Sequence, residues 1–178
     1  PKFDREACEQ RLKQTKVRND ARIRTLSKGM VAQLHLAVVM AIDARLLVLD
    51  EPTLGLDILF RKNFYETLIS EYFDENRTIV ITTHQVEEIE KILTHAIFIK
   101  DGKVVVDASM DELSEQILAV DVPSEKLEEA KALGPIHIRT GFGRTTLTFE
   151  GQDRETLSSF GEVHRLGLAD MFVAKMQG

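Results

Sequence analysis

The chain has 178 residues, with 23 basic and 29 acidic side chains and a formal net charge of −6. This length suits one domain, or one domain with a small appendage, and the acidic balance argues against a broad nucleic-acid-binding surface. The single cysteine, Cys8, excludes an internal disulfide and favours a reducing compartment. No apolar run reaches membrane-spanning length, so we expect any membrane association to go through a partner.

The beginning of the chain predicts two helices. Residues 4–20 are rich in charged and amide side chains, which is typical of a solvent-facing helix. Residues 31–42 are almost entirely apolar and predict a buried helix, with Ser27 placed to cap its N-terminus. The free N–H groups of a first helical turn attract anions, and Gly29 lets a ligand approach closely, so this turn is a candidate phosphate site. A serine cap before a core helix is also common without any ligand.

A run of four aliphatic residues, 46–49, predicts a strand of a parallel sheet that is covered on both faces. Asp50 and Glu51 end this strand, and ligands of open α/β sheets bind beyond the carboxyl ends of the strands. Because successive strand residues point to opposite sides, one carboxylate can hold a metal while the other faces a substrate water. The alternative interpretation is a buried strand that leads into an acidic surface turn at Pro52 and Gly55.

A second parallel strand is predicted after the amphipathic helix of residues 58–75. Residues 78–83 form a β-branched run that ends at His84. His84 should therefore lie at the same rim of the sheet as Asp50 and Glu51, where an imidazole can hydrogen-bond to a phosphate or to its attacking water. The alternative is an ordinary polar loop residue.

The C-terminal part predicts a hairpin and a small α+β unit. Residues 96–107 fold back at Asp101-Gly102, a favoured turn pair. Ser109 and Glu112 then match a capping box that starts a short helix to about Ile117, where we place a domain boundary. The predicted domains are residues 1–117 and 118–178. Within the second we expect strands at 118–122, 136–142 and 144–150, a hairpin turn at 141–146, and helices at 124–133 and 154–160.

Taken together and in order, four motifs resemble the second half of an ABC-type ATPase. They are Leu26-Ser27-Lys28-Gly29-Met30, the strand of residues 46–52 that ends in Asp-Glu-Pro, Leu54-Gly55-Leu56-Asp57, and Thr83-His84. The resemblance covers about residues 20–107. It implies an α/β fold: a partial P-loop NTPase (ABC ATPase) fold with parallel sheet strands and a helical signature segment, followed by the small C-terminal α+β domain.

The resemblance also implies roles for the residues at the strand ends. Asp50 would be the Walker B aspartate that helps to hold Mg²⁺, Glu51 would polarise the attacking water, and His84 would sense the γ-phosphate of ATP. Asp57 would organise the interface between two ATPase subunits.

The signature segment would bind the nucleotide held by the opposite subunit, with Ser27 and Gly29 contacting its γ-phosphate. Lys28 and Met30 depart from the commoner Leu-Ser-Gly-Gly-Gln form. The form present here resembles ATPase subunits that pair with a separately encoded permease. The implied protein is thus an ATP-binding and hydrolysing subunit that powers a transmembrane permease by ATP-driven dimerisation, as a homodimer or heterodimer, in the cytoplasm at the inner face of the membrane.

The family's phosphate loop (the Walker A motif), Gly-x-x-x-x-Gly-Lys-[Ser/Thr], does not occur in the 178 residues. We therefore interpret the chain as the C-terminal part of a longer ATPase and expect the isolated chain to bind ATP weakly and to hydrolyse none. We also expect an uncovered sheet edge and apolar face, which favour self-association.

Two other functions fit parts of the sequence. An ABC-superfamily ATPase of DNA repair or chromosome maintenance has a coil before its signature, but residues 4–20 have a poor heptad pattern and the net charge is negative, so no nucleic-acid partner is expected. A non-catalytic regulatory module would have kept the fold and lost turnover. The intact set of Asp50, Glu51 and His84 argues against that module.

Overall fold

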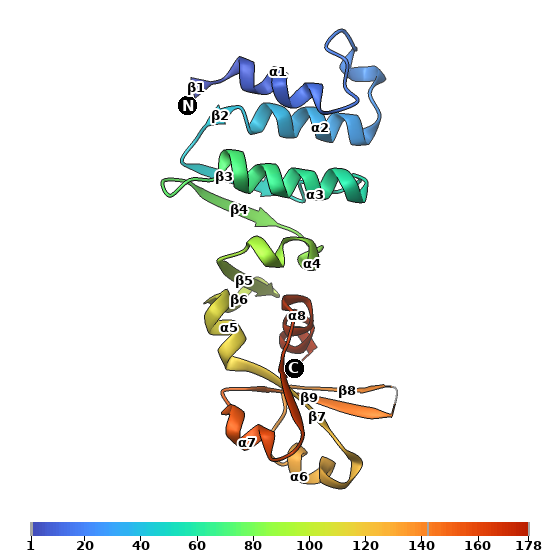
Figure 1. Ribbon diagram of the computed structural model, residues 1–178, viewed down its shortest axis with the longest axis vertical. Coiled ribbons are helices and arrows are strands. Elements are labelled where there is room, and N and C mark those ends of the chain that lie inside the picture. The colour runs from blue at the N-terminus through green and yellow to red at the C-terminus, as the bar shows by residue number, and fades with distance from the viewer. Residues whose placement is uncertain (1, 142, 178) are drawn as a thin grey trace. The chain divides into compact units, whose positions relative to one another are not determined.

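The computed structural model describes residues 2–141 and 143–177 and contains two compact units, residues 1–85 and 86–178 (Figure 1). The first unit consists of β1 (Lys2–Phe3), α1 (Arg5–Lys13), the 3₁₀ helix η1 (Ile23–Thr25), α2 (Lys28–Val39), β2 (Ile42–Asp43), β3 (Leu46–Asp50), α3 (Ile58–Thr67), the π-helical turn η2 (Leu68–Tyr72) and β4 (Thr78–Thr82). β3 and β4 pair in parallel, with Asp50 opposite Thr82. The carboxyl ends of the two predicted strands therefore meet at one rim.

The helices of the first unit begin where short polar side chains satisfy free backbone N–H groups. Ser27 accepts a hydrogen bond from the N–H of Met30 at 3.2 Å and starts α2. Asp57 accepts one from the N–H of Phe60 at 2.9 Å and starts α3. The first turn of α2 therefore begins at the signature segment, and the first turn of α3 begins at the Leu-Asp loop.

β3 is covered on one face and open on the other. Leu47 and Leu49 are 7% and 6% exposed, whereas Leu46 and Val48 are 57% and 60% exposed. Val80 on β4 is also exposed. The expectation that β3 is covered on both faces is therefore wrong for the described residues. Successive side chains point to opposite faces of a strand, and the described residues bury only one of them.

The second unit is a hairpin followed by a small α+β fold. Its elements are α4 (Val86–Ile89), the 3₁₀ helix η3 (Glu90–Ile92), β5 (His95–Lys100), β6 (Lys103–Ser109), α5 (Met110–Gln116), β7 (Ile117–Val122), the 3₁₀ helix η4 (Ser124–Lys126), α6 (Leu127–Lys131), β8 (His137–Gly141), β9 (Arg144–Glu150), α7 (Arg154–Ser158), β10 (Glu162–Arg165) and α8 (Leu168–Gln177). β5 and β6 form the predicted hairpin, and Gly141 pairs with Arg144 across the predicted turn, whose Phe142 lies outside the described residues.

The four-stranded sheet of this unit is antiparallel, with the order β10-β7-β9-β8. Together with α6 and α7, these strands follow the β-α-β-β-α-β order of ferredoxin-like folds. The α+β character expected for the C-terminal residues is thus present, with β10 and α8 as additional elements.

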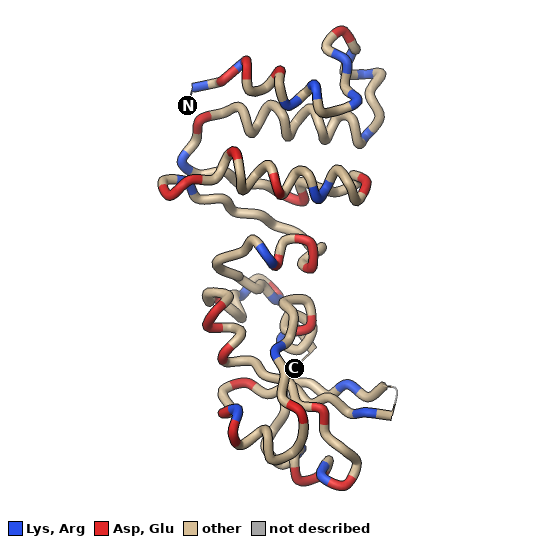
Figure 2. The backbone as a smooth tube through the Cα atoms, viewed as in Figure 1, with Lys and Arg blue, Asp and Glu red and all other residues tan. Residues whose placement is uncertain are grey.

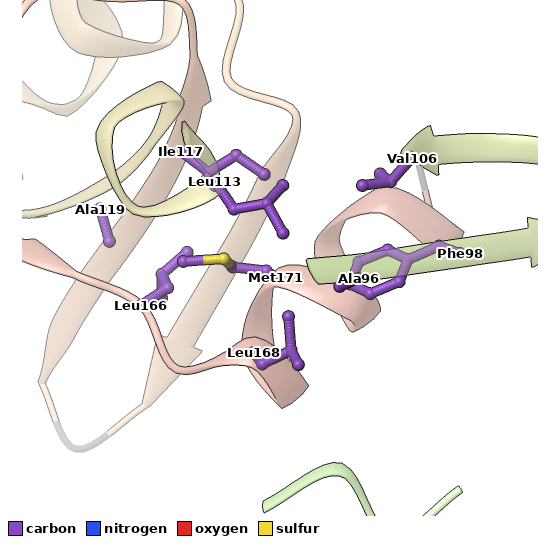
Figure 3. Close-up of a cluster of buried hydrophobic side chains, with 9 residues drawn as sticks. All are labelled: Ala96, Phe98, Val106, Leu113, Ile117, Ala119, Leu166, Leu168 and Met171. Carbon is purple, nitrogen blue, oxygen red and sulfur yellow. The ribbon is translucent and has the colours of Figure 1, made fainter. Parts of the chain in front are cut away.

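Two hydrophobic cores lie on opposite faces of β7. On one face, Leu118, Val120 and Val122 belong to a cluster that includes residues of α6, β9 and α7. On the other, Ile117 and Ala119 join residues of β5, β6, α5 and α8, whose side chains Figure 3 shows pointing toward one another around Met171. This second core contains residues from both sides of position 117, where the sequence predicts a domain boundary. The division into compact units instead lies after Gln85.

Basic and acidic residues are interspersed along the backbone of each unit (Figure 2). Within residues 2–141 and 143–177, no helix combines the length and apolarity needed to cross a bilayer.

Candidate functional site

The rim where β3 and β4 end carries the predicted acidic pair. Asp50, the last residue of β3, accepts a hydrogen bond from the hydroxyl of Thr82, the last residue of β4. The N–H of Glu51 donates to the carbonyl oxygen of Thr82 at 2.9 Å, and Glu51 has a φ of 43°. A positive φ is uncommon for a side-chain-bearing residue and marks a locally constrained turn. Glu51 therefore leaves the strand direction directly after its last ladder hydrogen bond.

The Glu51 carboxylate is oriented by the two residues that follow β4. Its Oε1 lies 2.7 Å from Nδ1 of His84 and accepts the His84 backbone N–H at 3.1 Å. Its Oε2 accepts the hydroxyl of Thr83 at 3.4 Å. If Nδ1 carries the only imidazole proton and donates a hydrogen bond to Glu51, Nε2 is left as an acceptor. The carboxylate and the imidazole thus hold each other at the rim, where His84 is mostly exposed and Glu51 is partly buried.

The residues present fit a metal held jointly with a phosphate. Mg²⁺ is usually bound by one or two carboxylates together with substrate phosphates and water. Asp50 is exposed, and Thr82 places a hydroxyl beside it. Within the described residues there is no cluster of three or more His, Cys, Asp or Glu side chains that could hold a metal without such help. Asp50 would therefore contribute one ligand of a site that a nucleotide completes.

The signature segment and the Leu-Asp loop form a second group in the same unit. A Cβ built on Gly29 would lie 3.6 Å from the carbonyl oxygen of Gly55, so the first turn of α2 approaches the loop that precedes α3. Ser27 and Asp57 at these two helix starts are exposed caps. Lys28 is exposed and Met30 partly buried in the same turn of α2. A Cβ at position 29 would therefore make only ordinary contact with this backbone neighbour.

Sequence reasoning missed the roles of two hydroxyl groups, those of Thr82, the last residue of β4, and of Thr83, which follows it. It treated Thr82 and Thr83 as part of a β-branched strand, yet their hydroxyls bind Asp50 and Glu51. The available signal was their position: they immediately precede His84 at the carboxyl end of a parallel strand. Arg61 of α3 was also missed, and its Nη1 donates to Oε1 of Gln85 at 2.7 Å, which connects α3 to the segment that carries His84.

Comparison with solved structures gives the class of fold. The structure titled "Structure of ATP binding subunit of ABC transporter" superposes with a TM-score of 0.52 at 22% identity, covering 62% of this chain and 48% of that one. Together with the parallel β3–β4 pair and the helical signature segment, this likeness identifies the P-loop NTPase fold of ABC ATPases. The predicted fold class is confirmed.

Sequence comparison identifies relatives of the chain. Residues 11–90 match the family "AAA domain, putative AbiEii toxin, Type IV TA system". The chain is 29% identical over 122 residues to the ABC transporter ATP-binding protein YtrB of Bacillus subtilis, covering 68% of this chain and 42% of the relative. It is 35% identical over 136 residues to the Nod factor export ATP-binding protein I of Cupriavidus metallidurans, covering 74% of this chain and 45% of the relative.

The chain is a homologue of the ABC transporter ATP-binding proteins, as its motifs predict. It spans less than half the length of these two relatives.

Proposed function

We propose that this chain supplies the water-activating rim and the signature segment of an ATP-hydrolysing subunit that drives a separate transmembrane permease. The observation that carries the proposal is the 2.7 Å contact between Glu51 and His84 at the rim that also holds Asp50. A carboxylate and an imidazole at the carboxyl ends of parallel strands are suited to a phosphate ester and its attacking water.

The residues of the rim divide the work by position. Glu51, aligned by Thr83 and the His84 backbone, accepts a proton from the water that attacks the γ-phosphate. His84 contacts Glu51 through Nδ1 and is mostly exposed. When both ring nitrogens carry protons, Nδ1 donates to Glu51 and Nε2 can donate to a phosphate oxygen. Asp50 would hold Mg²⁺ together with the nucleotide, and such an ion would supply positive charge against the phosphates.

The second group of residues acts on the nucleotide of an opposite ATPase subunit. The first turn of α2 presents backbone N–H groups beyond its Ser27 cap, and the N-terminus of a helix attracts phosphate. Ser27 and Gly29 contact the γ-phosphate, and Lys28 and Met30 belong to the same turn. Asp57 caps α3 two residues after Gly55, whose carbonyl oxygen lies beside this turn. In the proposal Asp57 organises the interface between the two subunits, which form a homodimer or heterodimer. Such a protein works in the cytoplasm, peripheral to the inner face of the membrane.

The proposal assigns the main phosphate cradle to a segment other than these 178 residues, because no Walker A motif occurs in them. The rim and the start of α2 offer the phosphates of ATP fewer contacts than a complete phosphate loop does. The isolated chain should therefore bind ATP weakly and hydrolyse none.

The test uses a polypeptide in which a phosphate loop precedes this chain. Glu51→Gln keeps the size of the side chain and removes its proton-accepting charge, so ATP hydrolysis should fall by about a hundred- to ten-thousand-fold. ATP binding should remain, because the substitution leaves the phosphate contacts in place. Glu75→Gln, which alters an exposed carboxylate in the turn before β4, is the matched control and should keep full turnover. Unchanged hydrolysis by Glu51→Gln would contradict the proposed role.

A further inference from the structure

The segment that connects α1 to α2 carries a local excess of positive charge. Residues 13–25, called the basic loop below, hold five of the chain's 23 basic side chains and one of its 29 acidic ones. The remaining residues have the opposite balance, with 18 basic and 28 acidic side chains. Figure 2 shows basic residues gathered where α1 ends and α2 begins. The basic loop is therefore a positive patch on an otherwise acidic chain.

Most cations of the basic loop are exposed and unpaired. Within the described residues, the one ion pair of the loop joins Arg18 to Asp20, with 2.6 Å between Nη2 and Oδ2. The other four basic side chains are exposed and have no acidic partner in the described part of the chain; they are Lys13, Lys16, Arg22 and Arg24. Neighbouring like charges repel one another, and a negatively charged partner relieves that repulsion.

The loop also presents an apolar side chain among its cations. The hydroxyl of Thr15 accepts the N–H of Val17 at 3.0 Å, and the side chain of Val17 is buried, so the first half of the loop is anchored to the fold. The 3₁₀ helix η1 in the second half places Ile23 between Arg22 and Arg24. Ile23 is 66% exposed. One aliphatic side chain thus stands in solvent between two cations.

The partner has to accept both the cations and the aliphatic side chain. The surface of a bilayer with anionic lipids accepts both, because its headgroups attract Lys and Arg and its acyl boundary receives apolar side chains. Clusters of about four to eight Lys and Arg are typical of such recognition. Single strands of nucleic acid are instead bound by cations together with aromatic side chains that stack on the bases, and residues 13–25 contain no aromatic residue.

We propose that the basic loop binds the headgroups of anionic phospholipids directly, with Ile23 at the boundary between headgroups and acyl chains. This contact goes beyond the proposed function, in which the permease brings the ATPase to the membrane. Each Lys or Arg near an anionic leaflet strengthens binding about fivefold, which corresponds to about 1 kcal/mol. The acidic balance of the other residues opposes their contact with the same lipids, so the loop is the part that faces the leaflet.

Flotation of the purified chain with lipid vesicles tests this binding. Vesicles of equimolar phosphatidylserine and phosphatidylcholine should carry the chain upward in a density gradient, whereas vesicles of phosphatidylcholine alone should not. Raising the salt from about 0.15 M to about 1 M shortens the Debye length from about 8 Å to about 3 Å and should release the chain. Self-associated protein does not float by itself and no nucleotide is present, so the result is independent of the proposed ATP hydrolysis.

Two double variants with the same change in net charge separate the loop from charge in general. Lys13→Gln combined with Lys16→Gln removes two cations of the loop, and a lipid titration should show binding to the mixed vesicles about thirtyfold weaker. Lys91→Gln combined with Lys103→Gln removes two exposed cations of the second unit and should leave binding unchanged.

Ile23→Ser tests the apolar part of the contact. It should weaken binding severalfold and keep the same dependence on salt, because it removes apolar burial and no charge. Equal binding to the two kinds of vesicle, equal losses in the two double variants, or full binding by Ile23→Ser would overturn the proposal. Binding of a single-stranded DNA oligonucleotide as tight as that of the mixed vesicles would also overturn it, because the loop would then be a nucleic-acid surface.

Discussion

At the scale of single residues, the account depends on how Glu51 is held. Its positive φ and three hydrogen-bonding contacts from residues 83 and 84 fix a carboxylate that would otherwise rotate freely in solvent. Preorganised groups need less rearrangement during reaction. The same contacts explain why the acidic pair is divided, with Asp50 bound to Thr82 on one strand end and Glu51 bound beyond it.

Cys8 gives a prediction about reactivity. The thiol is buried against α2, in a cluster with Ala37 and Ala41, and burial raises its pKa. Since the thiolate is the reactive form, alkylation by iodoacetamide at neutral pH should be much slower in the folded chain than in urea. Mass spectrometry of timed samples measures the two rates. Equal rates would show that the packing of α1 on α2 does not protect the thiol.

Gly29 gives a prediction that separates folding from function. The Cβ of an alanine at this position would make ordinary contacts, 3.6 Å from the Gly55 carbonyl oxygen, so Gly29→Ala should change the free energy of unfolding by no more than about 1 kcal/mol. The added methyl group nevertheless occupies the face by which a phosphate would approach. Chemical denaturation measures the change in the free energy of unfolding. ATP-dependent dimerisation, measured on the polypeptide in which a phosphate loop precedes this chain, tests whether the phosphate can still approach. Normal dimerisation would contradict the assignment of the signature turn.

At the scale of elements, the start of α5 is set by a complete capping box. Ser109 accepts the N–H of Glu112 at 3.2 Å, and Glu112 accepts the N–H of Ser109 at 2.8 Å. Ser109→Ala removes the cap and should lower the free energy of unfolding by about 1 kcal/mol. Urea denaturation followed by circular dichroism measures this loss, and Ser114→Ala within the same helix serves as the comparison. A similar loss in both variants would mean that the cap has no special role.

The same box makes stability depend on pH. Hydrogen bonds from the hydroxyl and backbone of Ser109 lower the pKa of Glu112 below its ordinary value of 4.5. A carboxyl whose pKa is lower in the folded state stabilises the fold above the unfolded pKa and loses that contribution as the pH falls through the folded pKa. Acidification from neutral pH to below 4.5 should therefore destabilise the wild type more than Glu112→Gln, as measured by urea denaturation at each pH. Parallel pH profiles would contradict this contribution.

The elements also show what the sequence can and cannot predict. Strands β3 and β4, the β5–β6 hairpin and the α5 cap follow from local patterns, and the parallel pairing of β3 with β4 places Asp50, Glu51 and His84 together as expected. The sequence does not predict β10, because only one of its four residues is buried and the strand lacks a regular alternation of apolar and polar residues. The run Leu46–Leu49 indicates an apolar strand but carries no information about which residues cover each face.

At the scale of the whole molecule, the exposed apolar face of β3 and β4 is the feature that favours self-association of the chain. Leu46, Val48 and Val80 expose apolar side chains on a parallel pair that has no third strand among the described residues. Exposed apolar faces and unpaired strand edges favour association. We expect the isolated chain to self-associate, with a mass in multi-angle light scattering that rises with concentration.

A charged substitution on this face tests the cause. Val48→Lys should shift the chain toward monomer, because a cation on the face opposes its burial in a contact. Ile23→Lys, the same charge change at an exposed apolar residue of η1, should leave the association unchanged. A wild-type chain that stays monomeric at all concentrations would contradict the prediction.

The central claim is that Asp50, Glu51 and His84 act on a nucleotide whose phosphate cradle is supplied by another segment. Steady-state ATP hydrolysis by the purified 178-residue chain, compared with its Glu51→Gln variant, tests this most directly. The account predicts no turnover above background for either protein. ATP turnover by the wild-type chain that disappears in Glu51→Gln would contradict it, because it would show that these residues form a complete active site by themselves.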